Sequence, residues 1–236
     1  MPEAPLSRVQ WPAAVRLIES KYPPIDLFED LAAPEDWELL AAAEARTNPR
    51  IAETIGNLDL VPVARRVSGP GASYVMAPFT HCSPDRPGRF HDGSFGAYYT
   101  ARDFATAVAE VTHHQARRLA DSRDEPGWIS DMRELVGRVH TELVDIRDGY
   151  FDSLLAPGDY ARSQVFARAH RDAGANGIVY PSVRNPGGEC VAAFWPDVVA
   201  RPVQGRHFRY HWDGRRIDII HELRFDGKGP IYRLEA

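Results

Sequence analysis

The segment 177–195 constrains the fold most strongly, because it contains two short apolar runs joined by a turn. Residues 177–181, GIVYP, form a run typical of a short buried strand. The NPGG sequence at 185–188 is typical of a reversing turn. Residues 190–195 return as a second apolar strand. We therefore expect a pair of connected strands that forms part of a sheet.

Further strands are predicted from runs of apolar and β-branched residues. They cover residues 58–67, 74–79, 136–146, 208–212, 217–221 and 231–234. Four helices are predicted from their end signals: residues 34–46, 49–56, a helix that begins after Asp103, and a helix from Asp159 to residue 173 that Gly174 ends. Together these elements predict an α+β fold, a compact mixed sheet flanked by helices.

The first 60 residues differ from the remainder in charge. They contain 11 acidic and 5 basic side chains, a net charge of −6, whereas the remaining 176 residues are near +1. We interpret residues 1–60 as an acidic helical extension packed on a core domain of residues 61–236.

Composition excludes several classes of function. A formal net charge of −5 argues against direct nucleic-acid binding. Cys82 and Cys190 lie far apart, so neither a Cys-x-x-Cys zinc site nor a secreted disulfide scaffold is expected. No apolar run is long enough to cross a membrane and the N-terminus does not resemble a signal peptide, so we expect a cytoplasmic protein. The histidines of residues 81–114 show no metal-binding spacing, and no metal is predicted.

The stretch GRFHDGSFGAYYTARDFATAVAE, residues 88–110, carries the strongest indication of function. It sets Arg89 and Tyr99 before a helix start, and Glu110 two turns into the helix. The apolar positions of that helix follow i, i+3, i+4, i+7 spacing, and Glu110 lies at the edge of the apolar stripe. Its carboxylate can therefore face a cleft that Arg89 and Tyr99 share.

Each of these residues also has a simpler interpretation. Arg89 can pair with a neighbouring aspartate of its own loop, Asp85 or Asp92. Tyr98 can take the place of Tyr99, because successive side chains of a strand point to opposite faces. Glu110 can pair with a histidine one turn further along its helix.

Residues 63–199 resemble the RES family, which is named after an arginine, a glutamate and a serine. The resemblance rests on the 88–110 stretch and on the run GIVYPSVRNPGGECVAAFWPDVV, which carries Ser182. The N-terminal segments PPIDLFED, TNPR and MAPFTH are similar to a longer branch of that family. The resemblance implies a fold like that of ADP-ribosyltransferases, consumption of NAD, and the role of toxin in a toxin–antitoxin pair.

The resemblance also implies roles for single residues. Glu110 would hold the nicotinamide ribose and stabilise an oxocarbenium-like transition state. Arg89 would pair with the pyrophosphate, and Tyr99 would stack on nicotinamide. Ser182 would add a hydrogen bond to the ligand, although it can also simply cap its turn. Arg66 is a candidate second phosphate ligand.

NAD is expected as a substrate, with no true cofactor and with water or inorganic phosphate as the attacking group. A helix-turn-helix antitoxin and a second copy of the chain are the expected protein partners. Two other functions stay open: transfer of ADP-ribose to an acceptor, and a catalytically silent domain that only binds its antitoxin.

Overall fold

The structure, a computed structural model, describes residues 3–21, 28, 31–48, 50–122, 124–224 and 226–234. Within these residues the chain forms eight strands: β1 (Leu6–Glu19), β2 (Tyr98–Ala101), β3 (Gly127–Asp145), β4 (Gly177–Pro181), β5 (Glu189–Ala193), β6 (Val203–Trp212), β7 (Ile217–Leu223) and β8 (Ile231–Arg233). The α-helices are α1 (Trp37–Glu44), α2 (Ile51–Ile55), α3 (Ala72–Thr80), α4 (Phe104–Ala120) and α5 (Ala161–Asp172). Short 3₁₀ helices occupy Pro34–Asp36, Leu58–Leu60, Val63–Arg65, Gly149–Leu154 and Pro196–Val198. The α+β class is thus confirmed.

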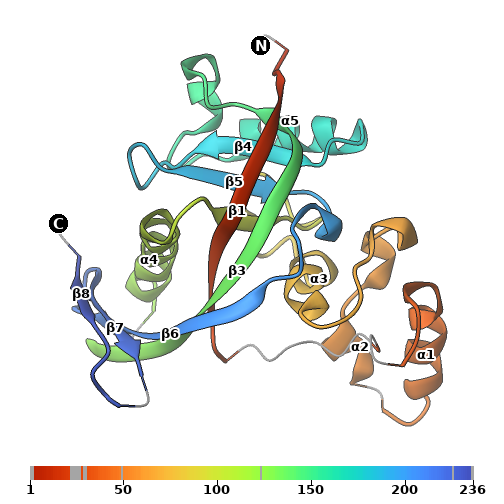
Figure 1. Ribbon diagram of the computed structural model, residues 1–236, viewed down its shortest axis with the longest axis horizontal. Coiled ribbons are helices and arrows are strands. Elements are labelled where there is room, and N and C mark those ends of the chain that lie inside the picture. The colour runs from red at the N-terminus through yellow and green to blue at the C-terminus, as the bar shows by residue number, and fades with distance from the viewer. Residues whose placement is uncertain are drawn as a thin grey trace.

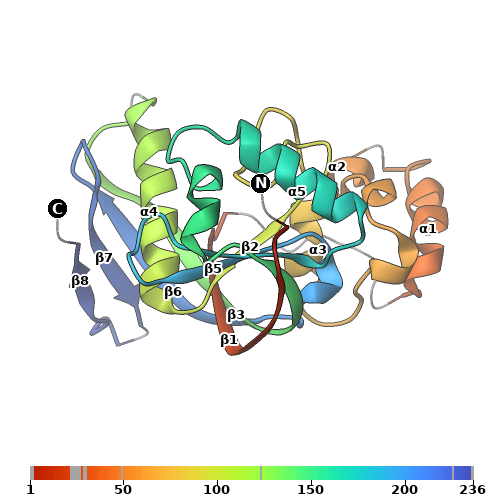
Figure 2. The same ribbon diagram turned by 90° about the horizontal axis from the view of Figure 1, so that it is seen from above.

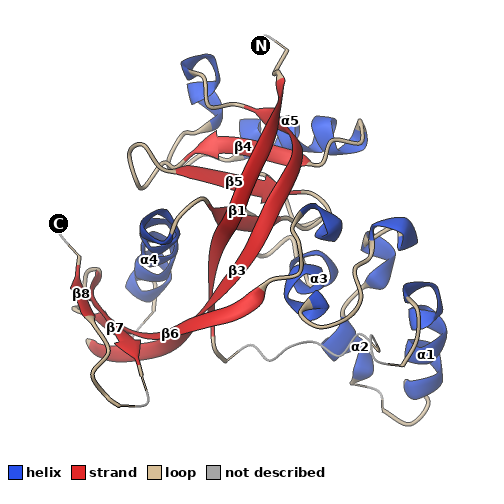
Figure 3. Cartoon of the chain, in the orientation of Figure 1, coloured by secondary structure: helices blue, strands red, loops and turns tan. Residues whose placement is uncertain are grey.

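The strands form one sheet in the order β1-β2-β5-β4-β3-β6-β7-β8, and β1 also pairs with β3. This additional pairing closes the first five strands on themselves, while β6, β7 and β8 continue from the other half of β3 (Figure 1). Figure 3 shows how β1 and β3 run side by side through the molecule. The strand pair predicted from segment 177–195 is confirmed as antiparallel β4 and β5.

The expectation of an extension made only of helices is wrong for residues 6–19. These residues form β1, which pairs with β3 from Leu6 opposite Val144 to Glu19 opposite Met132. The register shifts between Trp11 and Ala14, so Pro12 lies at the irregularity, where a residue without an amide hydrogen is tolerated. The predicted helices at 34–46 and 49–56 are confirmed as α1 and α2 with the turn before α1.

Two predicted strands are helical in the structure. Residues 58–67 contain two 3₁₀ turns, the first of which begins where the Asn57 side chain accepts a hydrogen bond from the Asp59 amide. Residues 72–80 form α3. Its buried residues Ala72, Val75, Met76 and Phe79 have i, i+3, i+4, i+7 spacing, so the period is that of a helix and not of a strand.

The sheet has an apolar layer on each face, and alternating strand residues divide between them. On β4, Ile178 and Tyr180 pack in one layer, whereas Val179 packs in the other. Helices α4 and α5 cover the first layer and α3 covers the second, as Figure 2 shows from above. The predicted start of α4 is confirmed, since the Asp103 carboxylate accepts a hydrogen bond from the Thr106 amide at 2.8 Å.

No helix in the described part of the chain is both long and apolar enough to cross a bilayer.

Candidate active site

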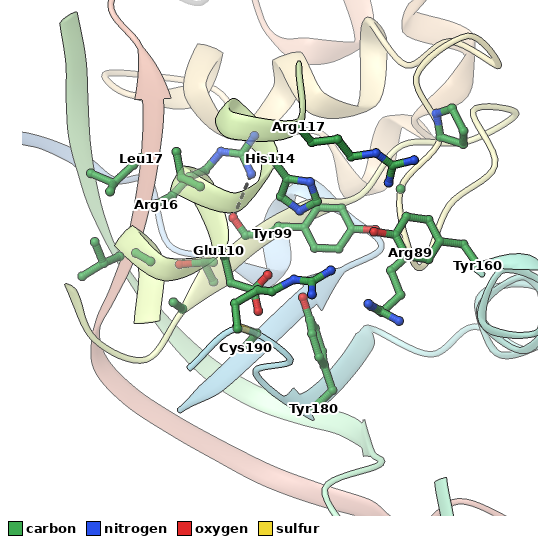
Figure 4. A pocket seen from close by; sticks show the side chains of 18 residues that line it. Arg16, Leu17, Arg89, Tyr99, Glu110, His114, Arg117, Tyr160, Tyr180 and Cys190 are labelled. Carbon is green, nitrogen blue, oxygen red and sulfur yellow. Dashed lines mark hydrogen bonds between the residues drawn. The ribbon is translucent and has the colours of Figure 1, made fainter. Parts of the chain in front are cut away.

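A cavity of about 360 Å³ opens on the α4 side of the sheet, between α4, β1, β2 and the loop before β2. Its charged lining consists of Arg16, Arg89, Arg117, Arg184 and Glu110, with the Tyr99 ring among them (Figure 4). Within the described residues, none of these four arginines forms a salt bridge with a carboxylate. The cavity is therefore strongly cationic around a single carboxylate, which suits an anionic ligand.

Glu110 lies on the cavity side of α4 and is held by a serine. The Ser182 hydroxyl donates a hydrogen bond of 2.6 Å to Glu110 Oε1. The same Ser182 oxygen accepts from the amides of Arg184 at 3.2 Å and Asn185 at 3.0 Å, so the turn after β4 aims the hydroxyl at the carboxylate. Within the described residues Glu110 Oε2 accepts no hydrogen bond, which leaves it for a ligand.

Ser182 therefore differs from its expected role as a direct ligand contact. It is buried and does not belong to the cavity lining. The Ser182 hydroxyl binds Glu110 and also caps the turn. The contact with the site and the capping of the turn therefore occur in one arrangement. Ser182 is a positioning residue for the carboxylate.

The two tyrosines of β2 are separated by the alternation of the strand. Tyr98 is buried in the layer under α3, where the Arg16 guanidinium lies 4.6 Å from its ring centroid. Tyr99 points to the opposite face and lines the cavity. Its hydroxyl accepts a hydrogen bond from the Phe90 amide at 2.9 Å, and burial raises its pKa, so the phenol stays protonated at neutral pH. Of the two alternatives, only Tyr99 can contact a molecule in this cavity.

The loop before β2 approaches Tyr99 closely because Gly88 has no side chain. A Cβ at Gly88 would lie 2.8 Å from the Tyr99 hydroxyl and 2.6 Å from His91 Nε2. The His91 ring lies beside the Tyr99 ring, with 5.8 Å between the two centroids. Burial lowers the pKa of this imidazole, so it is neutral at pH 7.

Arg89 is held in the cavity wall from one side of its guanidinium. Nη1 donates to the carbonyl oxygens of Leu154 at 3.2 Å and Ala156 at 2.9 Å, and the group lies 4.8 Å from the Tyr160 ring centroid. The expected competing pairing within its own loop is not formed: Asp92 binds Arg168 instead. Arg89 thus enters the cavity with a fixed direction and no carboxylate partner among the described residues.

Arg66 does not lie at the cavity. Its side chain is 2% exposed and pairs with Glu38 of α1. It also donates to the carbonyl oxygens of Val61 at 3.0 Å, Pro34 at 3.0 Å and Leu58 at 3.2 Å. All three guanidinium nitrogens are therefore occupied in joining α1 to the 3₁₀ turns. The assignment of Arg66 as a phosphate ligand is wrong for this structure, since no donor is left for a phosphate.

Sequence reasoning missed three of the cavity arginines. Arg16 lies on the unpredicted strand β1 and donates to the Tyr99 carbonyl oxygen at 2.8 Å. Arg117 follows Glu110 by two helical turns, a spacing that places both on one face of α4 and could have indicated it. Arg184 comes two residues after Ser182 and donates to the Pro157 carbonyl oxygen at 3.2 Å.

Three further groups line the cavity without a salt bridge to Glu110. His114 is exposed, and desolvation, with the charges of Arg184, Arg89 and Arg117, lowers its pKa in spite of the opposing charge of Glu110. Burial raises the pKa of the Cys190 thiol, which stays protonated. Tyr180 packs edge-on against Phe90 at 4.8 Å. Among the described residues, no group of three or more His, Cys, Asp or Glu side chains is placed to hold a metal ion.

Fold and site define an α+β protein with a cationic cavity organised around one serine-held carboxylate. The chain belongs to the RES domain family, whose model matches residues 63–213. A relative from Sinorhizobium fredii (strain NBRC 101917 / NGR234), the uncharacterized protein y4oC, is 31% identical over 224 residues, 94% of this chain and 91% of that protein. A solved structure, the M. tuberculosis MbcT–MbcA toxin–antitoxin complex, contains a chain that is 10% identical with a TM-score of 0.42, covering 88% of this chain and 87% of that one.

Proposed function

We propose that the protein depletes NAD by cleaving the bond between nicotinamide and ribose, as the toxin of a toxin–antitoxin pair. The observation that carries this proposal is the Ser182–Glu110 hydrogen bond of 2.6 Å inside a cavity whose other charged groups are arginines. A carboxylate among cations suits a substrate that combines a diphosphate with a cationic reacting centre. NAD has both features.

Arg89 and Arg16 are the proposed pyrophosphate ligands. Arg89 presents a planar fork whose direction is set by its carbonyl contacts and by Tyr160. Arg16 is anchored through the Tyr99 carbonyl on the neighbouring strand. The Tyr99 ring lines the same cavity as these two anchored arginines and offers an aromatic face for nicotinamide. Together they would bind the dinucleotide with its nicotinamide ribose toward Glu110.

The proposed chemical step needs charge stabilisation more than acid catalysis. The bond from ribose C1′ to the nicotinamide nitrogen breaks, and its electron pair neutralises the leaving pyridinium. Positive charge then develops on the ribose, where the Glu110 carboxylate stabilises it and accepts a hydrogen bond from the ribose hydroxyls. A water oxygen bonds to C1′ and loses a proton to solvent, which yields ADP-ribose and nicotinamide. With inorganic phosphate in place of water, the product is ADP-ribose 1-phosphate.

The biological setting is part of the same proposal and rests on the family resemblance. A helix-turn-helix antitoxin would bind the chain in the cytoplasm, and the chain would form a homodimer. NAD is the substrate, and no separate cofactor is required for this step.

The test follows NAD by chromatography and mass spectrometry after addition of the purified full chain, with and without inorganic phosphate. Wild-type protein should consume NAD, and Glu110→Gln should not. Accumulation of ADP-ribose 1-phosphate only when inorganic phosphate is present would identify phosphorolysis. A covalent mass shift on an added acceptor protein would identify a transferase instead. Intact NAD with folded wild-type protein would contradict the enzyme and favour the antitoxin-binding function.

A further inference from the structure

A second cavity of about 840 Å³, the α4–β8 groove, lies between α4 and the strands β7 and β8. Figures 1 and 2 both show these strands beside α4. The α4 residues that line the groove include Ala105, Ala109 and Ala116, and they occupy the helix face opposite to the one that carries Glu110. The groove is therefore a separate surface feature, although Arg184 lines both it and the candidate active site.

The floor of the α4–β8 groove is apolar. Val108 and Ile220 are buried core residues, and the partly buried rings of Phe104 and Tyr232 pack with 6.1 Å between their centroids. Along α4 the lining extends from Phe104 to Ala116, which at 1.5 Å per residue is about 18 Å. A floor of this length suits a segment of about three helical turns better than a single small ion.

The charge of the α4–β8 groove has one sign. Its formally charged lining side chains are all arginines: Arg184, Arg215, Arg216 and Arg233. Arg215 and Arg233 are exposed, so these guanidinium groups lie at the rim. Within the described part of the chain, only Arg216 of the four forms a salt bridge, with Asp213 at 3.8 Å, and no acidic side chain lines the groove. The rim is thus cationic on a chain of net charge −5, and it is complementary to carboxylates.

We propose that the α4–β8 groove binds an acidic, amphipathic helix of a partner protein. The apolar side of that helix would pack on the floor, and the alanines of α4 would allow a close approach of the two helices. Carboxylates on its flanks would pair with Arg215 and Arg233, because a guanidinium group binds a carboxylate through two parallel hydrogen bonds. This inference goes beyond the proposed function, since it uses none of the chemistry of the candidate active site.

Selection from a displayed library of random peptides tests the groove, with the full chain as the target. Peptides of about 16 residues are long enough for the three to four helical turns that the groove accommodates. Enriched peptides would be synthesised with a fluorescent label, and their affinities would be measured by fluorescence anisotropy.

Two groove variants and one control serve as comparisons. The double variant Arg215→Ala/Arg233→Ala removes charge from the rim. Ala105→Glu places a carboxylate in the groove, and because Ala105 is exposed in the first turn of α4, an acidic residue there is compatible with the helix. Arg162→Ala is the control, because Arg162 is an exposed residue of α5 that lines neither cavity. Circular dichroism would verify that each variant is folded.

The enriched peptides should be rich in Asp and Glu and should carry apolar residues at i, i+3, i+4, i+7 spacing. Both groove variants should bind them about tenfold more weakly or worse, whereas Arg162→Ala should keep the wild-type affinity. Binding to wild type should weaken as the salt concentration rises.

Three results would overturn the inference. The first is a selection that enriches no peptide, or only peptides without an excess of carboxylates. The second is equal affinity of the enriched peptides for wild type and the folded groove variants. The third is a wild-type dimer, measured by light scattering, that both groove variants dissociate, because the occupant would then be a second copy of the chain. None of these measurements depends on NAD turnover, so the inference and the proposed function can fail separately.

Discussion

Arg66 and Arg89 are both buried arginines that donate to backbone carbonyl oxygens, yet they differ in what remains of their hydrogen-bonding capacity. Arg66 uses all three nitrogens, and its charge is balanced by Glu38. The hydrogen bonds of Arg89 all come from one nitrogen, Nη1, and its charge faces a cavity without a carboxylate partner among the described residues. A saturated arginine stabilises the fold, whereas a partly occupied arginine in a cavity can bind a ligand.

The same difference extends to the regions around these residues. Around Arg66, α1 is joined to the 3₁₀ turns by hydrogen bonds whose donors and acceptors all belong to the chain itself. On the Arg89 side, Glu110 has one carboxylate oxygen that accepts no hydrogen bond from the described residues, and four arginines line the same cavity. The comparison predicts that substitutions near Arg66 change stability and that substitutions near Arg89 change ligand binding and turnover.

Glu110→Gln should have the largest effect. We expect turnover of NAD to fall by at least ~100-fold, because the neutral amide cannot stabilise positive charge on the ribose. NAD affinity and the unfolding temperature should change little, since glutamine has nearly the same shape. Stopped or continuous NAD assays beside calorimetry would measure these quantities. A fully active variant would exclude the proposed mechanism.

Arg66→Ala should lower the free energy of unfolding by about 2 to 3 kcal/mol, because several buried carbonyl oxygens and Glu38 lose their donor. Chemical denaturation would measure the change, with Arg46→Ala as the exposed control, for which we expect less than ~0.5 kcal/mol. NAD affinity per folded molecule should not change. A tenfold lower NAD affinity of fully folded Arg66→Ala protein would contradict the distinction between the two arginines.

Arg89→Lys should weaken NAD binding by roughly tenfold, because a point charge replaces the planar fork. Lysine retains the positive charge and can still donate to the Ala156 carbonyl oxygen, so the loop should stay folded. Calorimetry with NAD would show the loss, and Arg162→Lys serves as the exposed control. Equal affinity in wild type and Arg89→Lys would remove Arg89 from pyrophosphate binding.

Ser182→Ala should lower the rate of NAD turnover by roughly tenfold, because the loss of one hydrogen bond to a charged group costs about 1.5 kcal/mol. Ser163 provides a matched control, because it is also buried and its hydroxyl donates to the Tyr160 carbonyl oxygen at 3.0 Å. Ser163→Ala should change stability alone. Ser182→Thr, which keeps the hydroxyl, should retain the wild-type rate. A normal rate for Ser182→Ala would contradict the positioning role.

The smallest effect concerns acid stability of the loop that carries Arg89. Burial lowers the folded-state pKa of His91 below its ordinary value of 6.5. The stability that the neutral imidazole contributes is therefore complete above pH 6.5 and is lost as the pH falls from 6.5 through the lowered folded pKa. Replacement by His91→Gln should flatten the dependence of unfolding free energy on pH in this window. If the slope of unfolding free energy against pH between pH 7 and pH 5 is the same in His91→Gln as in wild type, His91 does not have the lowered folded-state pKa.

Prediction from sequence was most accurate where local signals and periodicity agree. The pair β4 and β5, the start of α4 at Asp103, and α5 all follow from turns, caps and apolar spacing in short windows. The strand predicted at residues 74–79 is instead part of helix α3, because a short apolar run fits both periods. Strand β1 was missed because its partner, β3, lies more than a hundred residues further along the chain.

The sequence by itself determined the residue types of the site and their order: an arginine, a tyrosine on a strand, a glutamate on the next helix and a serine after a buried strand. Tertiary structure alone decided which of them meet. It brought Arg16 to Tyr99 through β1, turned Ser182 toward Glu110 at 2.6 Å, and placed Arg66 against Glu38 instead of the cavity. The physical reason is that an arginine is functional or structural according to the acceptors that surround it, and those acceptors come from distant parts of the chain.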